Sequence, residues 1–539
     1  MLYLVIGLLA IAAATAAAPR LGVAAPLLLV VLGIAVSLLP FGPTVEIEPE
    51  WVLTGVLPPL LYAASAAMPA MEFRREFTAI RGLSVALVVL SAFALGWFFS
   101  LVVPGLGLAW GVALGAIVSP TDAVATSIAT RLGVSPRVVT MLEGESLLND
   151  ATALVLLRAA VAGAAASVSV WDVVGDFAYA VAVAVVLGAV VGKVVLAVRA
   201  RVTEASVSTV LSFTAPFLAA VPAEELGASG LVAAVVAGLV TGYGAARALP
   251  PRHRLSDESN WRTIELVLEG AVFLTMGLQL STVVDEVHGG LGTAAWVAAA
   301  ALALTVLVRA AYVALLLFAL QRRTRRGADL QPRLTGMQQR LDAGQSPYEG
   351  RRGRRRTSPR DVLRMRTRIT RGLADIEHFL AEPLGWRDGA VVVWAGMRGA
   401  ITLAAAQTLP EDTPQRSVLV LVAFLVATGS LLLQGGTLPW VVRAVGATRG
   451  EQPGADEERR RLLALMSDAA ATVTAPVVSD DPWARLTAAK GHRLAVLDAQ
   501  RDALLTARDD GAFSSAALTA ALAVLDADQL ALEMRGAPV

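Results

Sequence analysis

An acidic residue stands well inside an apolar run at Asp150, in residues 142–152. Ser146 lies about one helical turn earlier on the same face, and Asn149 directly precedes the acid. Charges inside a membrane are costly and usually functional. One carboxylate beside a hydroxyl and an amide oxygen suits a partly dehydrated hard cation, which prefers oxygen ligands. The spacing predicts a cation site, and the alternative is a carboxylate that only makes hydrogen bonds between helices.

A second acid of the same segment, Glu145, is expected to have a structural role. It is five residues before Asp150, which places it about 140° away around a helix. A lone Arg309 stands in another apolar run, and a charge there is not expected to lack a partner. The simplest pairing joins Glu145 to Arg309 as a buried ion pair that fixes two helices.

Two apolar runs are interrupted near their middles. In the first, Pro120 removes a backbone donor, so the helix should break and restart at Thr121 or Asp122, both good helix N-caps. In the second, Arg398 stands between two glycines. Paired interruptions indicate a transporter site, where an acid near helix N-termini and a base near C-termini balance the dipoles. A proline kink without function is the alternative for the first run.

The remaining titratable residues limit which kinds of binding or catalytic site the chain can form. Glu269 is a further acid that we expect to be buried, either supporting the core or acting in regulation. The absence of cysteine excludes disulfides, thiolate metal sites and cysteine nucleophiles. The four histidines fall in expected loops or the tail without paired spacing, so no metal or other cofactor is expected beyond the transported ions.

The composition indicates lipid as the main solvent of these segments. The chain has 539 residues, of which 56% are hydrophobic and 17% charged, and its mean hydropathy is +0.64. A soluble domain would carry about 25% charged residues. The net charge of +1 gives no indication of a nucleic-acid partner.

Apolar runs long enough to cross a membrane recur along the chain. We count about thirteen spans, and the fold expected is an all-α polytopic membrane protein. The spans are 2–18, 21–39, 51–70, 80–103, 106–130, 138–163, 173–198, 206–221, 226–246, 262–280, 291–320, 387–408 and 416–443.

The loops between these spans alternate in charge. Loops after odd-numbered spans carry arginines, whereas the others are neutral or acidic, with Arg416 as the one exception. Basic loops stay on the cytoplasmic side of a membrane. The pattern predicts an inner-membrane protein with an external N-terminus and a cytoplasmic C-terminus.

Two polar parts should leave the membrane. The membrane part is then divided into 1–320 and 387–446, separated by an Arg-rich cytoplasmic insertion at 321–386. The arginine run at 351–356 favours a solvated basic loop that holds topology, with attraction to anionic lipid as the alternative. Residues 447–539 predict a small helical cytoplasmic tail, without a glycine-rich nucleotide motif.

Three segments carry a family resemblance. They are Ser-Pro-Thr-Asp-Ala-Val-Ala at 119–125, Glu-Gly-Glu-Ser-Leu-Leu-Asn-Asp at 143–150 and Gly-Met-Arg-Gly-Ala-Ile at 396–401. They resemble the sodium/proton exchanger family of monovalent cation:proton antiporters, in particular its bacterial members. The similarity extends over essentially the whole membrane part, and the insertion and tail lie outside it.

The resemblance implies a fold and a set of roles. It implies two inverted six-helix repeats joined by the seventh helix, crossed broken helices 5 and 12, and a homodimer embedded in lipid. By matching position, Asp150 resembles the ion and proton carrier and Asn149 its partner. The remaining matches are Ser146 and the Thr121 carbonyl as ligands, Asp122 in the crossing, Glu145 paired with Arg309, Arg398 at the twelfth-helix break and Glu269 as a tenth-helix acid.

One departure from the family concerns the third span. Some prokaryotic members place a carboxylate there that reaches the ion through water, whereas this span has no acid before Glu72. Access to the site or the choice of ion is expected to differ accordingly.

The function expected is secondary active Na⁺/H⁺ antiport. A proton or a cation neutralises Asp150, and the empty charged site does not cross the low-dielectric barrier. Asn149 is not a second acid, so the exchange should be one-for-one and electroneutral. K⁺/H⁺ exchange by the same fold stays open, and a cation channel is less favoured because no carbonyl-rich filter loop is present. An enzyme is not expected, since no histidine stands within a span to serve a serine–histidine pair.

Overall fold

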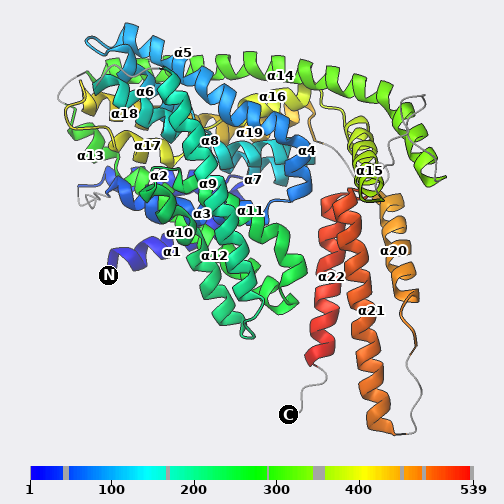
Figure 1. The fold of residues 1–539 in the computed structure, drawn as a ribbon. Helices are drawn as coiled ribbons and strands as arrows, with labels where there is room; N and C mark the ends of the chain where they lie inside the picture. Colours follow the sequence, from blue (N-terminus) through cyan, green and yellow to red (C-terminus); the bar gives the residue numbers. More distant parts are fainter. Residues whose placement is uncertain are drawn as a thin grey trace. The chain divides into compact units, whose positions relative to one another are not determined.

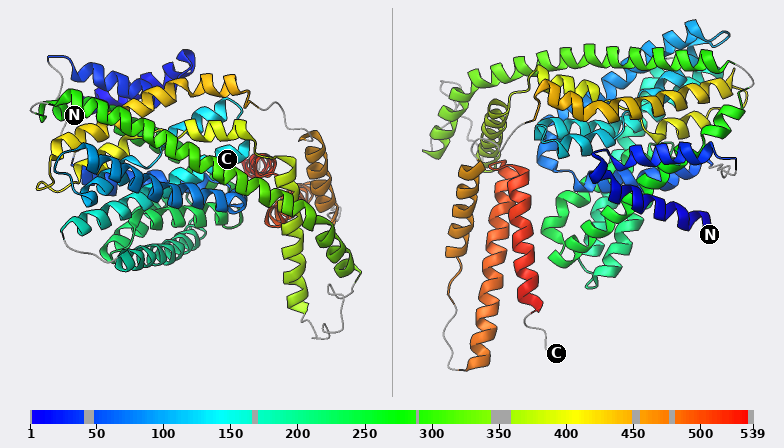
Figure 2. Two further views of the ribbon diagram at one scale, coloured as in Figure 1. Left: turned by 90° about the horizontal axis from the view of Figure 1, so that it is seen from above. Right: turned by 180° about the vertical axis from the view of Figure 1, so that it is seen from behind.

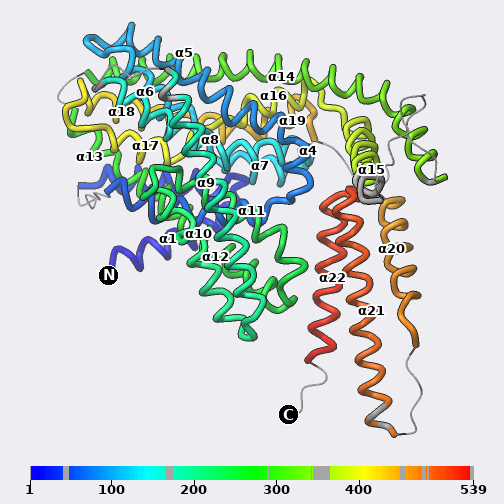
Figure 3. Tube along the Cα trace, viewed as in Figure 1, coloured from blue at the N-terminus to red at the C-terminus, as the bar shows by residue number. Residues whose placement is uncertain are grey.

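The computed structural model describes residues 2–40, 48–165, 170–287, 290–343, 359–448, 455–475 and 481–534. Within these ranges the chain is helical, and extended backbone pairs only in an isolated bridge between Val134 and Thr448. The predicted all-α class is confirmed (Figure 1). Figure 3 traces the path of the chain through the same elements.

Short π-helical stretches, η1 to η3, adjoin some of the α-helices. In chain order the elements are α1 (Leu2–Leu21), α2 (Ala25–Ser37), η1 (Trp51–Val56), α3 (Leu57–Ala67), α4 (Ala70–Arg81), η2 (Gly82–Ala86), α5 (Leu87–Val102), α6 (Leu108–Val118), α7 (Val124–Arg131), α8 (Pro136–Ala165), α9 (Val170–Arg199), α10 (Ala205–Glu225), α11 (Gly230–Ala248), α12 (Pro251–Leu278), α13 (Leu280–Asp285), α14 (Leu291–Asp342), α15 (Pro359–Ala381), α16 (Trp386–Trp394), α17 (Ala400–Gln407), α18 (Arg416–Ser430), η3 (Leu431–Gly435), α19 (Gly436–Val445), α20 (Ala455–Ala471), α21 (Pro482–Asp510) and α22 (Ser515–Met534).

Ten helical stretches within the described residues are long and apolar enough to cross a membrane. They are α1, α4 to α5, α8, α9, α10, α11, α12 to α13, α14, α18 to α19, and α22. Three shorter apolar helical stretches are α2, η1 to α3, and α6. The chain is thus a multi-pass membrane protein. The count of thirteen spans and the inverted-repeat layout stay predictions.

The chain divides into two compact units. One, here called the membrane unit, comprises Met1–Ala248, Ser256–Leu317 and Gly385–Arg449. The other, here called the tail unit, comprises Leu249–Leu255, Phe318–Leu384 and Gly450–Val539. The expected insertion and the expected tail therefore belong to one compact body.

Small residues allow close helix packing in the membrane unit. A methyl group added to Gly111 or Gly115 of α6 would collide with the main-chain oxygen of Gly96 or Ala92 on α5. Membrane helices approach closely through such small residues because lipid gives no hydrophobic drive between them. This packing holds α6 against α5 up to the point where α6 ends.

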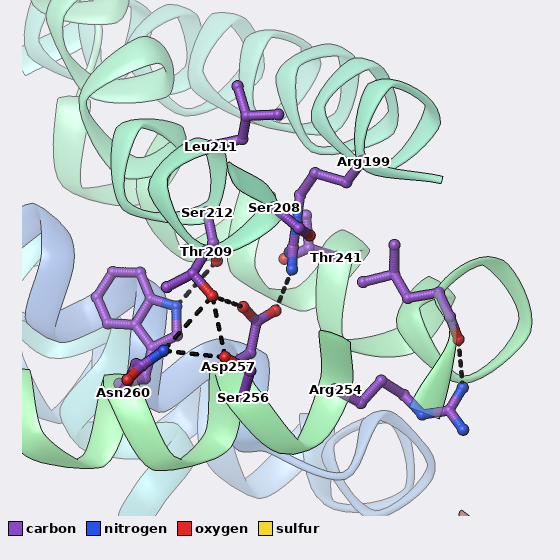
Figure 4. Close-up of polar contacts among 12 residues, drawn as sticks. Arg199, Ser208, Thr209, Leu211, Ser212, Thr241, Arg254, Ser256, Asp257 and Asn260 are labelled. Carbon is purple, nitrogen blue, oxygen red and sulfur yellow. Dashed lines mark hydrogen bonds and ion pairs between the residues drawn. The ribbon is translucent and has the colours of Figure 1, made fainter. Parts of the chain in front are cut away.

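A polar cluster ties together the ends of α9, α10 and α12 in the membrane unit (Figure 4). Arg199, the last residue of α9, forms an ion pair with Asp257 of α12. The hydroxyl of Thr209, on α10, donates to Asp257 at 3.4 Å and accepts from the Asn260 amide at 3.4 Å. The Arg199 cation lies at a helix C-terminus, where the helix dipole favours it. The cluster therefore fixes the beginning of α12 relative to two neighbouring helices.

The tail unit contains a bundle of α20, α21 and α22, which lie side by side (Figure 2). Leu462, Leu504, Leu518 and Leu525 form its buried apolar core. Although α22 is apolar enough to cross a membrane, its buried leucines face this core, so the bundle itself covers part of its apolar surface.

The expected loop at 321–386 is helical where the structure describes it. Helix α14 continues without a break from its apolar part to Asp342, and α15 occupies Pro359–Ala381. The solvated-loop interpretation is wrong for these parts. On α15, apolar Ile369, Leu373 and Ile376 recur at helical spacing, which gives the segment a face to bury. The arginine run at 351–356 lies outside the described residues.

Candidate ion-binding site

Two interrupted helices meet through their main chains. Helix α6 ends at Val118 and α7 begins at Val124, whereas α16 ends at Trp394 and α17 begins at Ala400 (Figure 3). The amide of Asp122 in the first gap donates to the carbonyl of Met397 in the second at 2.8 Å. Pro120 cannot donate a helical hydrogen bond, which favours the break at this point. The two gaps therefore contact each other directly.

Arg398 is bound by carbonyl groups at the ends of two half-helices. Its Nε donates to the carbonyl of Val118 at 2.9 Å, and its guanidinium also donates to the carbonyls of Ser119 and Gly396. These carbonyls lie at the C-terminal ends of α6 and α16, where a helix dipole favours a cation. Arg398 is buried, and it forms no ion pair within the described residues. Its charge is satisfied by main-chain dipoles instead of by an acid.

Asp122 lies at helix N-termini where the two gaps meet, whereas Arg398 lies at helix C-termini. The Asp122 Oδ1 accepts from the amide of Val124, the first residue of α7, at 2.9 Å. A methyl group added to Gly399, the N-cap of α17, would overlap the Asp122 carboxylate. The acid therefore lies against the N-terminal ends of both α7 and α17, where a helix dipole favours an anion.

A hydrogen-bond chain links the first gap to α8. The Asn149 amide nitrogen donates to the Thr121 carbonyl at 3.0 Å and to its hydroxyl at 2.8 Å. The Thr121 hydroxyl in turn donates to Glu145 at 3.0 Å. These contacts turn the Asn149 carbonyl oxygen the other way, and this fully buried oxygen has no hydrogen-bond partner in the described part of the chain. It is available as a ligand.

Glu145 and Arg309 lie together as a buried ion pair. Both Arg309 terminal nitrogens donate to the Glu145 carboxylate, one of them at 2.8 Å. The Arg309 Nε donates to the carbonyl of Val392 at 2.9 Å, so the pair also reaches α16. Arg309 of α14 thus connects its own helix to α8 through Glu145 and to α16 through Val392.

Asp150 has no partner for its carboxylate among the described residues. Its side chain is 4% exposed, and its carboxylate makes no hydrogen bond or ion pair within the described ranges. The charged group that interacts with it electrostatically is another acid, Asp122. Ser146 is buried one turn earlier, and its hydroxyl donates to the carbonyl of Glu143 at 3.0 Å, which leaves its oxygen lone pairs available. A buried carboxylate in such surroundings needs a proton or a cation to neutralise it.

Glu269 lies beside this site on α12. The charges that interact with it are those of Asp122, Glu265 and Arg131. Its side chain is half-buried and makes no hydrogen bond among the residues described. Glu265 is one turn earlier on the same helix, so α12 presents two acids on one face.

Several partners of the crossing were not found by sequence reasoning. The Ser430 hydroxyl of α18 accepts from the amide of Arg398 at 2.8 Å, and the Trp394 indole donates to the Thr437 hydroxyl of α19 at 2.9 Å. Both hydroxyls lie in an apolar stretch, which is the signal that was overlooked. They hold the second gap against the last membrane helices on either side of η3.

The comparison with family models decides the family. Residues 6–444 match the model described as sodium/hydrogen exchanger, transmembrane. This chain belongs to that sodium/hydrogen exchanger family. The resemblance expected from the three motifs is confirmed.

Individual relatives of this exchanger-family chain agree with the match. It is 29% identical to an uncharacterized Na⁺/H⁺ exchanger of Mycobacterium tuberculosis, over 98% of this chain and 97% of the relative. It is also 29% identical to a sodium, potassium, lithium and rubidium/H⁺ antiporter of Bacillus subtilis, over 49% of this chain and 40% of that protein. The solved sodium proton antiporter of Methanocaldococcus jannaschii shares the fold, with a TM-score of 0.58, 15% identity and coverage of 82% of this chain and 97% of that one.

Proposed function

We propose that this chain exchanges Na⁺ for H⁺ at Asp150. The observation that carries the proposal is the buried carboxylate of Asp150, which has no counter-charge among the described residues. It lies on the same helix as the Asn149 carbonyl oxygen, which has no hydrogen-bond partner among them. Na⁺ prefers oxygen ligands. Asp150, Asn149, Ser146 and the carbonyl of Thr121 supply carboxylate, amide, hydroxyl and main-chain oxygens. No cofactor takes part, because the cargo itself supplies the neutralising charge.

Exchange follows from competition for one carboxylate. A proton and a cation each neutralise Asp150, and each excludes the other. The loaded site crosses the membrane barrier, whereas the empty site keeps a bare charge whose transfer through low dielectric is prohibitive. We propose that the half-helices of the crossing move with α8 as one body, which is an elevator-type motion with alternating access.

The charge count predicts electroneutral transport. Arg309 already neutralises Glu145, and the residue before Asp150 is the uncharged Asn149. One proton therefore replaces one cation on one acid. A current recorded from proteoliposomes after a Na⁺ jump should be indistinguishable from that of empty liposomes, and a sustained transport current would contradict the one-for-one exchange.

The deciding experiment is proton flux in proteoliposomes. A pH gradient is imposed, Na⁺, Li⁺ or K⁺ is added, and wild type is compared with Asp150→Asn. We expect Na⁺ to collapse the gradient in wild type and not in the variant. Asp285→Asn, which changes an exposed acid, is the matched control and should transport normally. Collapse that survives in Asp150→Asn would contradict the carrier role, and Asp122 and Glu269 would be tested next.

The same experiment tests K⁺/H⁺ exchange, the second candidate. The Bacillus subtilis relative is named for sodium, potassium, lithium and rubidium, and oxygen ligands alone do not exclude K⁺. Collapse with K⁺ and not with Na⁺ would replace the Na⁺ proposal by this one. A gradient that collapses without saturation and without counter-exchange would indicate a channel instead.

Assembly and orientation are part of the proposal. We place the protein in the bacterial inner membrane as a homodimer, with the N-terminus outside and the C-terminus in the cytoplasm. The arginine-bearing loops support the orientation, and the family supports the assembly. Cross-linking in membranes and labelling of single cysteines introduced into this cysteine-free chain test both.

A further inference from the structure

Helix α14 does not end where its apolar part ends. It runs as one helix from Leu291 to Asp342 (Figures 1 and 2). Directly after the expected membrane span come four arginines within five residues, at 322, 323, 325 and 326. The first acid further along the helix is Asp329. Four positive charges therefore lie on the same helix just after the expected membrane span.

The arginines continue an exposed apolar face of the same helix. Leu315 is 69% exposed and Phe318 is 53% exposed, and both lie within the expected span 291–320. At 100° per residue, Leu315, Phe318, Arg322, Arg325 and Arg326 fall within a sector of about 100°. Along α14, this exposed apolar face thus passes, within one or two turns, into exposed guanidinium groups.

Contacts inside the chain leave these arginines available. The Arg322 guanidinium lies 4.2 Å from the centre of the Phe318 ring, so it is held over the apolar face. Arg325 and Arg326 are exposed and make no hydrogen bond or ion pair in the part of the chain that the structure describes. Arginines needed only for helix packing would be covered by protein, and these are not.

We propose that Arg322, Arg325 and Arg326 bind the phosphate headgroup of an anionic phospholipid. The guanidinium fork matches phosphate geometry. Clusters of this kind next to a membrane helix attract anionic lipid. Leu315 and Phe318 pack against the acyl chains of the same lipid. In the orientation proposed above, this lipid lies in the cytoplasmic leaflet.

Lipid binding to the full-length protein tests the proposal without relying on transport. The detergent-purified protein receives phosphatidylglycerol or phosphatidylcholine, bound lipids are counted by native mass spectrometry, and the thermal midpoint is measured. We expect phosphatidylglycerol to bind and to raise the midpoint more than phosphatidylcholine does. Arg325→Gln with Arg326→Gln should lose at least one bound phosphatidylglycerol and most of the added stability. Arg325→Lys with Arg326→Lys should keep part of both.

A control double variant distinguishes lipid binding at a specific site from attraction to the overall positive charge of the protein. Arg333→Gln with Arg459→Gln removes the same charge from exposed positions elsewhere and should bind lipid like wild type. Equal lipid loss in both double variants would contradict the site, as would unchanged binding in Arg325→Gln with Arg326→Gln. Inorganic phosphate alone should give no stabilisation, and an equal gain with phosphate would overturn the lipid assignment. Because no arm measures ion flux, failure here and failure of the antiport proposal are distinguishable.

Discussion

Glu145 accepts contacts from two sides at the centre of the site. Arg309 binds both carboxylate oxygens, and Thr121 donates to one of them at 3.0 Å. The pair is buried, so removing one partner leaves an uncompensated charge in low dielectric. Arg309→Met should lower the free energy of unfolding by about 3–5 kcal/mol. Unfolding of the detergent-solubilised protein, followed by tryptophan fluorescence, measures this loss.

A double variant tests whether the loss arises from charge. Glu145→Leu with Arg309→Met removes both charges and keeps similar volume, so it should recover most of the stability lost in Arg309→Met. A double variant as unstable as the single one would contradict the ion-pair explanation. It would indicate that the Thr121 contact of Glu145 carries the stability.

Single residues were predictable where charge stands in an apolar run. Glu145 and Arg309 were paired by asking which buried charge neutralises which, and the structure brings them together. The Thr121–Asn149 hydrogen bonds cannot be predicted by matching opposite charges, since neutral side chains have many possible partners. Ser430 was missed for the same reason, because a hydroxyl in a helix usually bonds its own preceding turn.

At the scale of elements, Gly399 lets the two interrupted helices approach. Its backbone is extended, with φ −114° and ψ −169°, which any residue adopts. The obstacle to a side chain is the Asp122 carboxylate, which a methyl group there would overlap. Gly399→Ala should therefore displace Asp122 from the start of α17 and reduce exchange by about tenfold or more, as small misplacements do in preorganised sites. Initial rates of cation-driven proton flux in proteoliposomes measure this.

The chain offers a matched control for this change. Gly436, at the start of α19, has open space around the position of a methyl group. Gly436→Ala should leave flux unchanged. Equal flux in Gly399→Ala and wild type would show that Asp122 need not occupy its place against α17.

Elements were predictable where local chemistry forces a break and were missed where it does not. Pro120 and the two glycines around Arg398 marked both interruptions in advance. The continuation of α14 past its apolar part has no such signal, because arginine, glutamine and leucine favour a helix in water as in lipid. Hydropathy alone therefore predicts a loop for such a polar tract. Hydropathy reports the solvent of a segment and not its backbone conformation.

At the scale of the whole molecule, composition distinguishes the membrane segments from the polar ones. It does not show which polar segments pack together. The tail unit unites residues that are far apart in sequence, and one of its contacts joins Arg254 to Asp526, 272 residues away. Pairings at that separation leave no periodic trace in the chain. Helices α12 and α14 each contribute residues to both units.

The Arg254–Asp526 contact gives the last prediction. Asp526 is buried and accepts from Arg254 at two oxygens and from Arg501 at 2.9 Å. Asp526→Asn removes the buried carboxylate that Arg254 and Arg501 share, and the acid that stays paired with Arg501 in the described part of the chain is the exposed Asp498. Breaking such a buried group costs about 3–5 kcal/mol. The bundle of α20 to α22 should open locally, so limited trypsin digestion of the full-length protein should cut there faster than in wild type. Asp528→Asn, an exposed change two residues along α22, should leave the digestion rate unchanged. Equal protection of both variants would mean that the leucine core alone holds the bundle and that Arg254 does not tie the first turn of α12 to it.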